Sequence, residues 1–296
     1  MSTDRSTDHF AGKVVVITGA GSGMGREMAV QLAGRGARLA LSDVDERGLA
    51  ETGRQCEVLG AQVRTDRLNV AERAEVETYA ETVAGHFGVV NIVINNAGIA
   101  FSGEVERSEY KDIERVMDVD FWGVVNGTKA FLPHLIASGD GHVVNTSSLF
   151  GLLSMPSQSA YNAAKFAVRG FTESLRQEML IAGHPVKVSC VHPGGIKTAI
   201  ARNSTAAEGH DAKALAEFFD AKLAKMTADD AARVILAGVE RGKPRILVGA
   251  DAKVMDALVR VVGARYQRLF ATVAGRIMPK AVAPPSTGPA AARGEL

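Results

Sequence analysis

The sequence predicts an α/β protein built on one doubly wound parallel sheet of about seven strands, with helices on both faces. Three observations lead to this fold class. Apolar stretches typical of strands alternate with helical patterns along most of the 296 residues. Several of these stretches are continuously apolar, as in parallel strands that are buried on both faces. No repeat or linker interrupts the alternation, so residues 13–250 are expected to form a single domain.

The expected strands are short stretches rich in Val, Ile and Leu, and the first of them reads KVVVITG. In chain order they cover 13–19, 37–43, 61–65, 89–98, 141–148, 186–194 and 245–249. Longer stretches with a helical pattern lie between the strands. They cover 24–34, 46–59, 71–86, 109–137, 158–182 and 228–241.

Two segments fall outside this alternation. Residues 196–226 form a polar, alanine-rich insert at the carboxyl edge of the sheet, where a substrate lid is expected. Over 251–280, apolar residues recur at helical spacing with arginines on the other side, which predicts an amphipathic helical extension. Its apolar residues are Met255, Val259, Val262, Tyr266, Phe270, Val273 and Ile277. The polar start, 1–12, is expected to be flexible, and the Pro-, Ala- and Gly-rich tail, 281–296, to be disordered.

The composition narrows the function classes. A net charge of +1 and the lack of nucleic-acid-binding motifs argue against a nucleic-acid partner. Only two cysteines, far apart, indicate a reducing compartment rather than a disulfide framework. No secretory signal and no apolar run of membrane-spanning length is present, so a cytoplasmic location is expected. The seven histidines show no metal-binding spacing, so no metal is expected.

A glycine-rich turn lies between the first strand and the first helix. Gly19, Gly23 and Gly25 would permit a tight turn and a close approach of the backbone to a pyrophosphate, which would meet the helix N-terminus. The alternative is a purely structural turn. Asp43, at the end of the second strand, is placed to accept from adenosine ribose hydroxyls, and no Lys or Arg follows it directly to receive a 2′-phosphate. This favours NAD over NADP, unless Asp43 only caps the next helix.

Tyr161 and Lys165 lie four residues apart in an alanine-rich helical stretch, so their side chains share one helix face. Taken alone, this could be an accidental pair on an exposed face. Four further patterns make it specific: TGxxxGxG over 18–25, Asn-Asn-Ala-Gly over 95–98, Ser148 thirteen residues before Tyr161, and Pro-Gly at 193–194. Together with the Tyr–Lys pair, these five motifs resemble the short-chain dehydrogenase/reductase family, which has the Rossmann fold.

The resemblance implies roles for individual residues. Tyr161 would be the acid/base, Ser148 would polarise the substrate oxygen, and Lys165 would hold the nicotinamide ribose. The phenol has a reference pKa of about 10, and the lysine together with the oxidised nicotinamide would lower the pKa of Tyr161. The cofactor contacts implied in this way are Gly19, Ser22, Gly23, Met24, Gly25, Asp43, Val44, Asn69, Val70, Asn96, Ala97, Gly98, Val119, Tyr161, Lys165, Pro193, Gly194, Ile196 and Thr198.

The chain departs from the family pattern at two positions. Asp120 stands where the family usually has an asparagine that helps to hold a water in a proton relay. Asp120 would accept from that water or pair with Lys165, and it is counted with the catalytic residues; the alternative is that it faces elsewhere. Asn69 stands where the family commonly has aspartate, and its amide oxygen can still accept from the adenine amino group.

The segment between Ser148 and Tyr161 indicates an apolar substrate pocket. Its apolar residues are Leu149, Leu152, Leu153 and Met155, with Phe101 as a further candidate, although some of them could belong to the core. The expected substrate is a small-molecule alcohol or ketone. A hydrophobic secondary alcohol or ketone would fit, and so would a small diol or an acetoin-like molecule.

The function expected is therefore that of an NAD-dependent alcohol dehydrogenase or ketone reductase acting on CH–OH groups. The alternatives are an NADP-linked carbonyl reductase and a catalytically weakened regulatory protein that binds the cofactor. The resemblance also implies a homotetramer or dimer assembled through helices 109–137 and 158–182. For the C-terminal extension, packing within the oligomer is favoured over covering the substrate cleft or contacting an acidic membrane surface.

Overall fold

The computed structural model describes residues 8–198, 200, 203–209, 211–219, 221 and 224–277. Residues 281–296, predicted to be disordered, lie outside these residues, and so do residues 1–7 of the segment 1–12 that was predicted to be flexible. Within 8–12, the side chain of Phe10 is buried. Seven parallel strands form one sheet in the order β11-β7-β6-β4-β1-β2-β3, which confirms the predicted fold class. The strands are β1 Val14–Thr18, β2 Arg38–Asp43, β3 Val63–Arg67, β4 Ile92–Asn95, β6 Gly141–Thr146, β7 Val186–Pro193 and β11 Arg245–Val248.

The strand order reverses next to β1. The chain runs outward from β1 through β2 to β3 and then returns to place β4 on the other side of β1. The crossover connections on the two sides therefore lie on opposite faces and leave a crevice at the carboxyl ends of β1 and β4. In sheets of this kind, ligands bind at that point.

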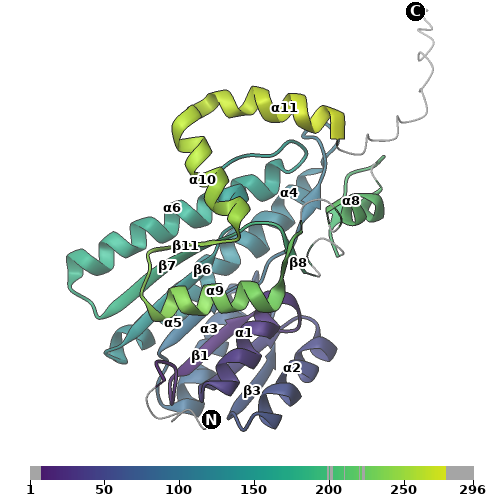
Figure 1. The fold of residues 1–296 in the computed structure, drawn as a ribbon. Helices are drawn as coiled ribbons and strands as arrows, with labels where there is room; N and C mark the ends of the chain where they lie inside the picture. The colour runs from purple at the N-terminus through teal and green to yellow at the C-terminus, as the bar shows by residue number, and fades with distance from the viewer. Residues whose placement is uncertain are drawn as a thin grey trace, which may run out of the picture.

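Two layers of helices cover the sheet, as Figure 1 shows. The helices of the main domain are α1 Gly23–Gly34, α2 Glu46–Val58, α3 Arg73–Phe87, α4 Tyr110–Met117, α5 Gly123–Ala137, α6 Ser159–Ala182 and α9 Ala228–Glu240. Val15 and Ile17 of β1 pack in a core with α1, α2 and α9, whereas Val14 and Val16 pack with α3, α5 and α6. Because both faces of β1 are buried, its sequence is continuously apolar.

The helix expected over 109–137 is divided. A π-helical turn, η2 Asp118–Trp122, separates α4 from α5. Asp120 lies in this turn, and its carboxylate accepts from the backbone N–H of Ile99 (2.7 Å). Turns of this type often mark functional sites.

The insert at 196–226 forms short strands and one short helix. β8 Ile196–Lys197 pairs with β10 Met226–Thr227, and β9 Thr205–Ala206 pairs with β5 Phe101–Ser102. The short helix is α8 Ala212–Phe218. These pairings connect the insert to the loop after β4 and to the start of α9.

The C-terminal extension consists of two helices rather than one. α10 Ala250–Val262 and α11 Tyr266–Ile277 are separated by a 3-10 turn, Gly263–Arg265. Gly263 has φ +55°, a left-handed conformation that interrupts the helix. In Figure 1 both helices lie at the top of the molecule, away from α1, α2 and the N-terminus. Within the described ranges, no helix combines the length and apolar character needed to cross a membrane.

Candidate active site

A cavity of about 1220 Å³ lies at the carboxyl ends of the strands, where the strand order reverses. Its walls come from the turns after β1, β2, β3, β4, β6 and β7, from α6, from the insert, and from α10 and α11. All but four of the predicted site residues line it. Gly25, Asp120 and Leu152 are absent from the lining, and so is Phe101, which is buried with Val116 and Ala160.

The turn after β1 is shaped by close backbone contacts. Gly19 has φ +65°, and a Cβ added there would lie 2.7 Å from the Cα of Ala97. Gly25 lies beneath the cavity, where an added Cβ would collide with the carbonyl oxygen of Gly19. Asn96 fixes the turn from the other side, because its Nδ2 donates to the carbonyl oxygens of Thr18 (3.1 Å) and Gly19 (3.3 Å). The glycines are therefore required by the packing of the turn.

The N-terminus of α1 opens into this turn. Ser22 is its N-cap residue and lines the cavity, but its side chain makes no capping hydrogen bond. The first N–H groups of a helix have no partner within the helix and carry the positive end of its dipole. The cradle around Gly19 and Gly23 therefore fits the pyrophosphate of a dinucleotide.

Asp43 lies at the rim of the same cavity. Its Oδ2 accepts from the N–H of Gly21 (2.8 Å) and its Oδ1 from the N–H of Asp45 (2.9 Å). The N-cap of α2 is Asp45, which accepts from the N–H of Gly48 (3.1 Å), so capping α2 is not the role of Asp43. Among the cavity-lining residues that the structure describes, the cations are Lys165 and Lys225, and none is an arginine.

The second predicted departure, Asn69, also lines the cavity. Its Oδ1 accepts from the N–H of Ala71 (3.2 Å) within its own turn. Leu68 and Val70, on either side of Asn69, line the cavity with it.

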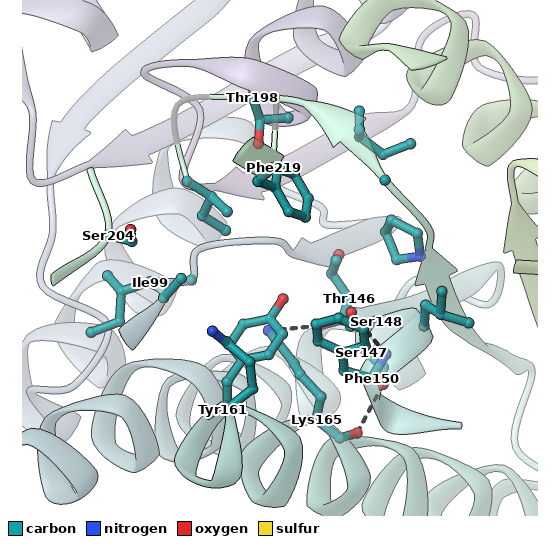
Figure 2. Close-up of a pocket in the computed structure, with 18 of the residues that line it drawn as sticks. Ile99, Thr146, Ser147, Ser148, Phe150, Tyr161, Lys165, Thr198, Ser204 and Phe219 are labelled. Carbon is teal, nitrogen blue, oxygen red and sulfur yellow. Dashed lines mark hydrogen bonds between the residues drawn. The ribbon is translucent and has the colours of Figure 1, made fainter. Parts of the chain in front are cut away.

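Tyr161 and Lys165 project from α6 into the cavity toward Ser148, which follows β6 (Figure 2). The Nζ of Lys165 lies 5.4 Å from the centre of the Tyr161 ring. Lys165 also donates to the carbonyl oxygen of Thr146 (3.3 Å). The Ser148 hydroxyl accepts from the N–H of Phe150 (3.1 Å) and keeps its own proton for a further acceptor.

Asp120 lies behind this group and pairs with Lys165 at 3.0 Å, and both side chains are buried. Of the two roles considered for Asp120, the ion pair is the one that the structure shows. Burial by itself would lower the pKa of Lys165, but the charges of Asp120 and Tyr161 outweigh it, so this pKa is raised. The lysine therefore carries a positive charge beneath the phenol.

The surroundings of Tyr161 shift the pKa of its phenol in opposing directions. Burial, the largest of them, raises the pKa of Tyr161, and the Asp120 carboxylate adds to the rise, whereas Lys165 and a hydrogen bond with Ser148 oppose it. Lys165 thus acts in the expected direction, but burial outweighs it and the pKa is raised overall. The phenol is a proton donor in this state, and its anion requires additional positive charge.

Several lining residues were not predicted from the sequence. The large apolar ones include Leu68, Ile99, Phe150, Ile200, Phe218, Phe219, Met255, Phe270 and Val273. The helical spacing of Met255, Phe270 and Val273 predicts that these residues share the apolar face of an amphipathic helix. Nothing in the local sequence indicated that this helix would reach the cavity.

The chain is similar to known proteins. A model of the short chain dehydrogenase family matches residues 13–209. A Mycobacterium tuberculosis protein named oxidoreductase SadH is 63% identical over 270 residues, which cover 91% of this chain and 98% of that protein. Estradiol 17-beta-dehydrogenase 11 of Mus musculus is 30% identical over 261 residues, which cover 88% of this chain and 83% of the mouse protein.

A similar solved structure is a short chain dehydrogenase/reductase from Burkholderia phymatum in complex with NAD. It shows 31% sequence identity and a TM-score of 0.78, and the match covers 94% of this chain and 99% of that one.

Proposed function

The chain belongs to the short-chain dehydrogenase family of oxidoreductases, and on this premise we propose that it transfers a hydride between NAD(H) and a secondary alcohol or ketone. One observation carries the proposal: Ser148, Tyr161 and Lys165 face one cavity that also contains an uncapped helix N-terminus within a glycine cradle. The insert lines this cavity with Ile200, Phe218 and Phe219, which supports its role as a lid.

The residues of the chain would handle the proton. When bound, NAD(H) supplies or accepts the hydride at its nicotinamide ring. During oxidation, Tyr161 Oη takes the hydroxyl proton of the substrate, and during reduction it returns a proton to the carbonyl oxygen. The Ser148 hydroxyl donates to the same substrate oxygen and stabilises the charge that develops there. Lys165, kept charged by Asp120, stabilises the tyrosinate from below.

The preference for NAD rests on Asp43. Its carboxylate is held at the cavity rim by two backbone N–H groups, where it can accept from the ribose hydroxyls but would repel a 2′-phosphate. The Burkholderia relative was solved with NAD, which is consistent with this preference.

The catalytic role is tested with Tyr161→Phe. This variant keeps the ring and removes the acid/base group, so kcat on a ketone or alcohol should fall about 10²- to 10⁴-fold. Binding of NADH, followed by fluorescence, should be retained. Tyr110→Phe is the matched control, because Tyr110 is exposed on α4. Undiminished turnover by Tyr161→Phe would overturn the proposal.

The cofactor preference is tested by thermal-shift titration of the whole protein with NADH and NADPH. NADH should stabilise it more, and Asp43→Ser should weaken NADH binding by about 1.5–3 kcal/mol, the usual worth of a hydrogen bond to a charged group. Glu46→Gln is the control, because its side chain is largely exposed. Stabilisation by NADPH alone would overturn the role of Asp43.

A further inference from the structure

Resting on the function proposed above, we propose that the substrate is an uncharged, bulky apolar secondary alcohol or ketone, and that α10 and α11 form the wall that selects it. The sequence leaves the size of the substrate open, from a hydrophobic secondary alcohol or ketone to a small diol or an acetoin-like molecule. The shape and lining of the cavity point to a larger molecule, of the size of a lipid chain or a fused ring system.

Hydrogen bonds hold the two C-terminal helices in position beside the active site. At the start of α10, the carboxylate of Asp251 accepts from the N–H of Gly195 (2.7 Å), in the loop that follows β7. At the start of α11, the buried Tyr266 accepts through its hydroxyl from the N–H of Ser154 (2.9 Å), six residues after Ser148. Both helices are thus attached to loops that carry the active-site residues.

These two helices turn apolar side chains toward the cavity. Met255 of α10 and Phe270, Ala271 and Val273 of α11 line the cavity. The Phe270 ring is supported by Tyr266 in an edge-to-face contact, with 5.4 Å between ring centres. The helices therefore add an apolar wall to a site whose catalytic groups come from the sheet and α6.

The other walls of the substrate region are apolar as well. The loop after Ser148 contributes Leu149, Phe150, Leu153 and Met155, and the insert contributes Phe218 and Phe219. Figure 2 shows Phe219 across the cavity from Tyr161. An alcohol or ketone whose oxygen reaches Tyr161 would therefore extend its remaining atoms between apolar surfaces.

The charges in the lining favour an uncharged substrate over an acidic one. Of the two cations among the described lining residues, Lys165 is paired with Asp120, and Lys225 lies beside Gly195 in the loop after β7. Glu104 adds a negative charge to the lining. Away from Lys225, a carboxylate held between these apolar surfaces would lose its hydration without gaining a partner.

The volume supports a large occupant. Single-ligand pockets commonly measure about 300–1,000 Å³. The present cavity, at about 1220 Å³, joins the dinucleotide cradle to the apolar region in one space. A substrate as small as acetoin would leave most of the apolar wall in contact with water.

The experiment uses the full chain with NADH and straight-chain methyl ketones from four to twelve carbons. If the apolar wall binds the chain, kcat/KM should rise about fourfold for each added methylene until the cavity is filled. A ketone of the longest length that ends in a carboxylate should be about tenfold poorer or worse. Binding is measured separately, by thermal shift of the NAD⁺-saturated protein with tertiary alcohols of the same lengths, which cannot be oxidised.

The wall is tested with Phe270→Ala, which should lose about tenfold more kcat/KM on the longest ketone than on the shortest. Leu269→Ala is the matched control, because the neighbouring Leu269 is 55% exposed and absent from the lining. Phe270→Trp provides a second variant that keeps the apolar contact but fills the cavity, and it should also penalise the longest ketone.

The outcomes separate the two proposals. Turnover of short ketones with no gain in kcat/KM or thermal shift along the series would overturn the bulky substrate and leave the proposed function standing. A rising series that Phe270→Ala and Leu269→Ala change equally would overturn the assignment of the wall to α11. Absence of turnover on every ketone and alcohol, despite NADH binding, would overturn the proposed function and the substrate class with it.

Discussion

At the scale of the residue, the ion pair between Asp120 and Lys165 distinguishes this site from the pattern of its family. The pair keeps the lysine charged in a buried position, but the same carboxylate raises the pKa of Tyr161. The two effects oppose each other at the phenol. The balance between them sets the pH at which Tyr161 can accept a proton.

Replacing Asp120 by asparagine should change the pKa of Tyr161 and with it the pH profile of activity. Without the negative charge, the pKa values of Tyr161 and Lys165 should both fall, because Asp120 raises both, so the rising limb of the pH profile for alcohol oxidation should shift to lower pH. The measurement is kcat/KM against pH for the wild type and the variant. An unchanged profile would remove Asp120 from the mechanism.

The same variant carries a cost in stability. Asp120 accepts from Ile99 through one oxygen and faces Lys165 with the other, so an asparagine must turn its NH₂ group toward one of these donors. We expect a loss of about 1–3 kcal/mol in the free energy of unfolding, measured with urea. Equal stability of the two proteins would show that the site rearranges around the amide.

At the scale of the element, the unit formed by β1, its turn and α1 was the most predictable part of the molecule. Glycines at 19, 23 and 25 were interpreted as a phosphate cradle, and the structure shows why larger residues would not fit at Gly19 and Gly25. The boundaries of α4, η2 and α5 were less predictable. The π turn depends on Asp120 meeting Ile99 and Lys165, and neither contact is local in sequence.

The close packing of this unit predicts the effect of Gly25→Ala. Its added methyl group would meet the carbonyl oxygen of Gly19, so the turn must open and both stability and NADH binding should fall. Gly34→Ala, at the other end of α1, is the control, because nothing lies within 4 Å of a Cβ added there. That change should be neutral or stabilise the protein by up to about 1 kcal/mol.

Thermal melts with and without NADH separate the two glycine variants. A Gly25→Ala protein that is as stable as the wild type and binds NADH equally well would contradict the packing argument. A destabilised protein whose NADH affinity is intact would place the strain in the fold alone and would argue against the cradle as the phosphate site.

At the scale of the whole molecule, apolar surface remains on the helices through which an oligomer was expected. Trp122 is 44% exposed at the end of η2 and Phe166 is 38% exposed on α6. These residues support the proposal of a homo-oligomer assembled through α5 and α6, which light scattering would test. The C-terminal helices line the cavity of their own chain, which was one of the alternatives considered for them, and their packing within an oligomer stays a prediction.

The core also makes the fold sensitive to acid. His142 and His192 are buried within β6 and β7, and burial lowers the pKa of His142 to about 3 and that of His192 to about 4. An unfolded chain binds these protons near pH 6.5, so between that pH and the lowered values the unfolded state holds more protons. The contribution to stability is complete above pH 6.5 and is lost as the pH falls.

We therefore expect the free energy of unfolding to fall between pH 6.5 and pH 4, by up to about 1.4 kcal/mol per pH unit for each histidine. Urea unfolding at a series of pH values measures the slope. His142→Gln, which keeps a donor for the hydroxyl of Ser189, should reduce that slope. A slope that is unchanged in this variant would assign the acid sensitivity to other groups.

The sequence by itself determined the succession of strands and helices along the chain, because this depends on periodicity. It also determined the glycine cradle, which depends on glycine geometry, and the Tyr161–Lys165 pair, whose members lie one helical turn apart. Only the tertiary structure decided that Asp120 pairs with Lys165, that Leu152 lies outside the cavity lining, and that α10 and α11 line the cavity. Those contacts join residues far apart in the chain. An amphipathic pattern records that a helix has an apolar face, but the surface that buries this face is chosen by packing.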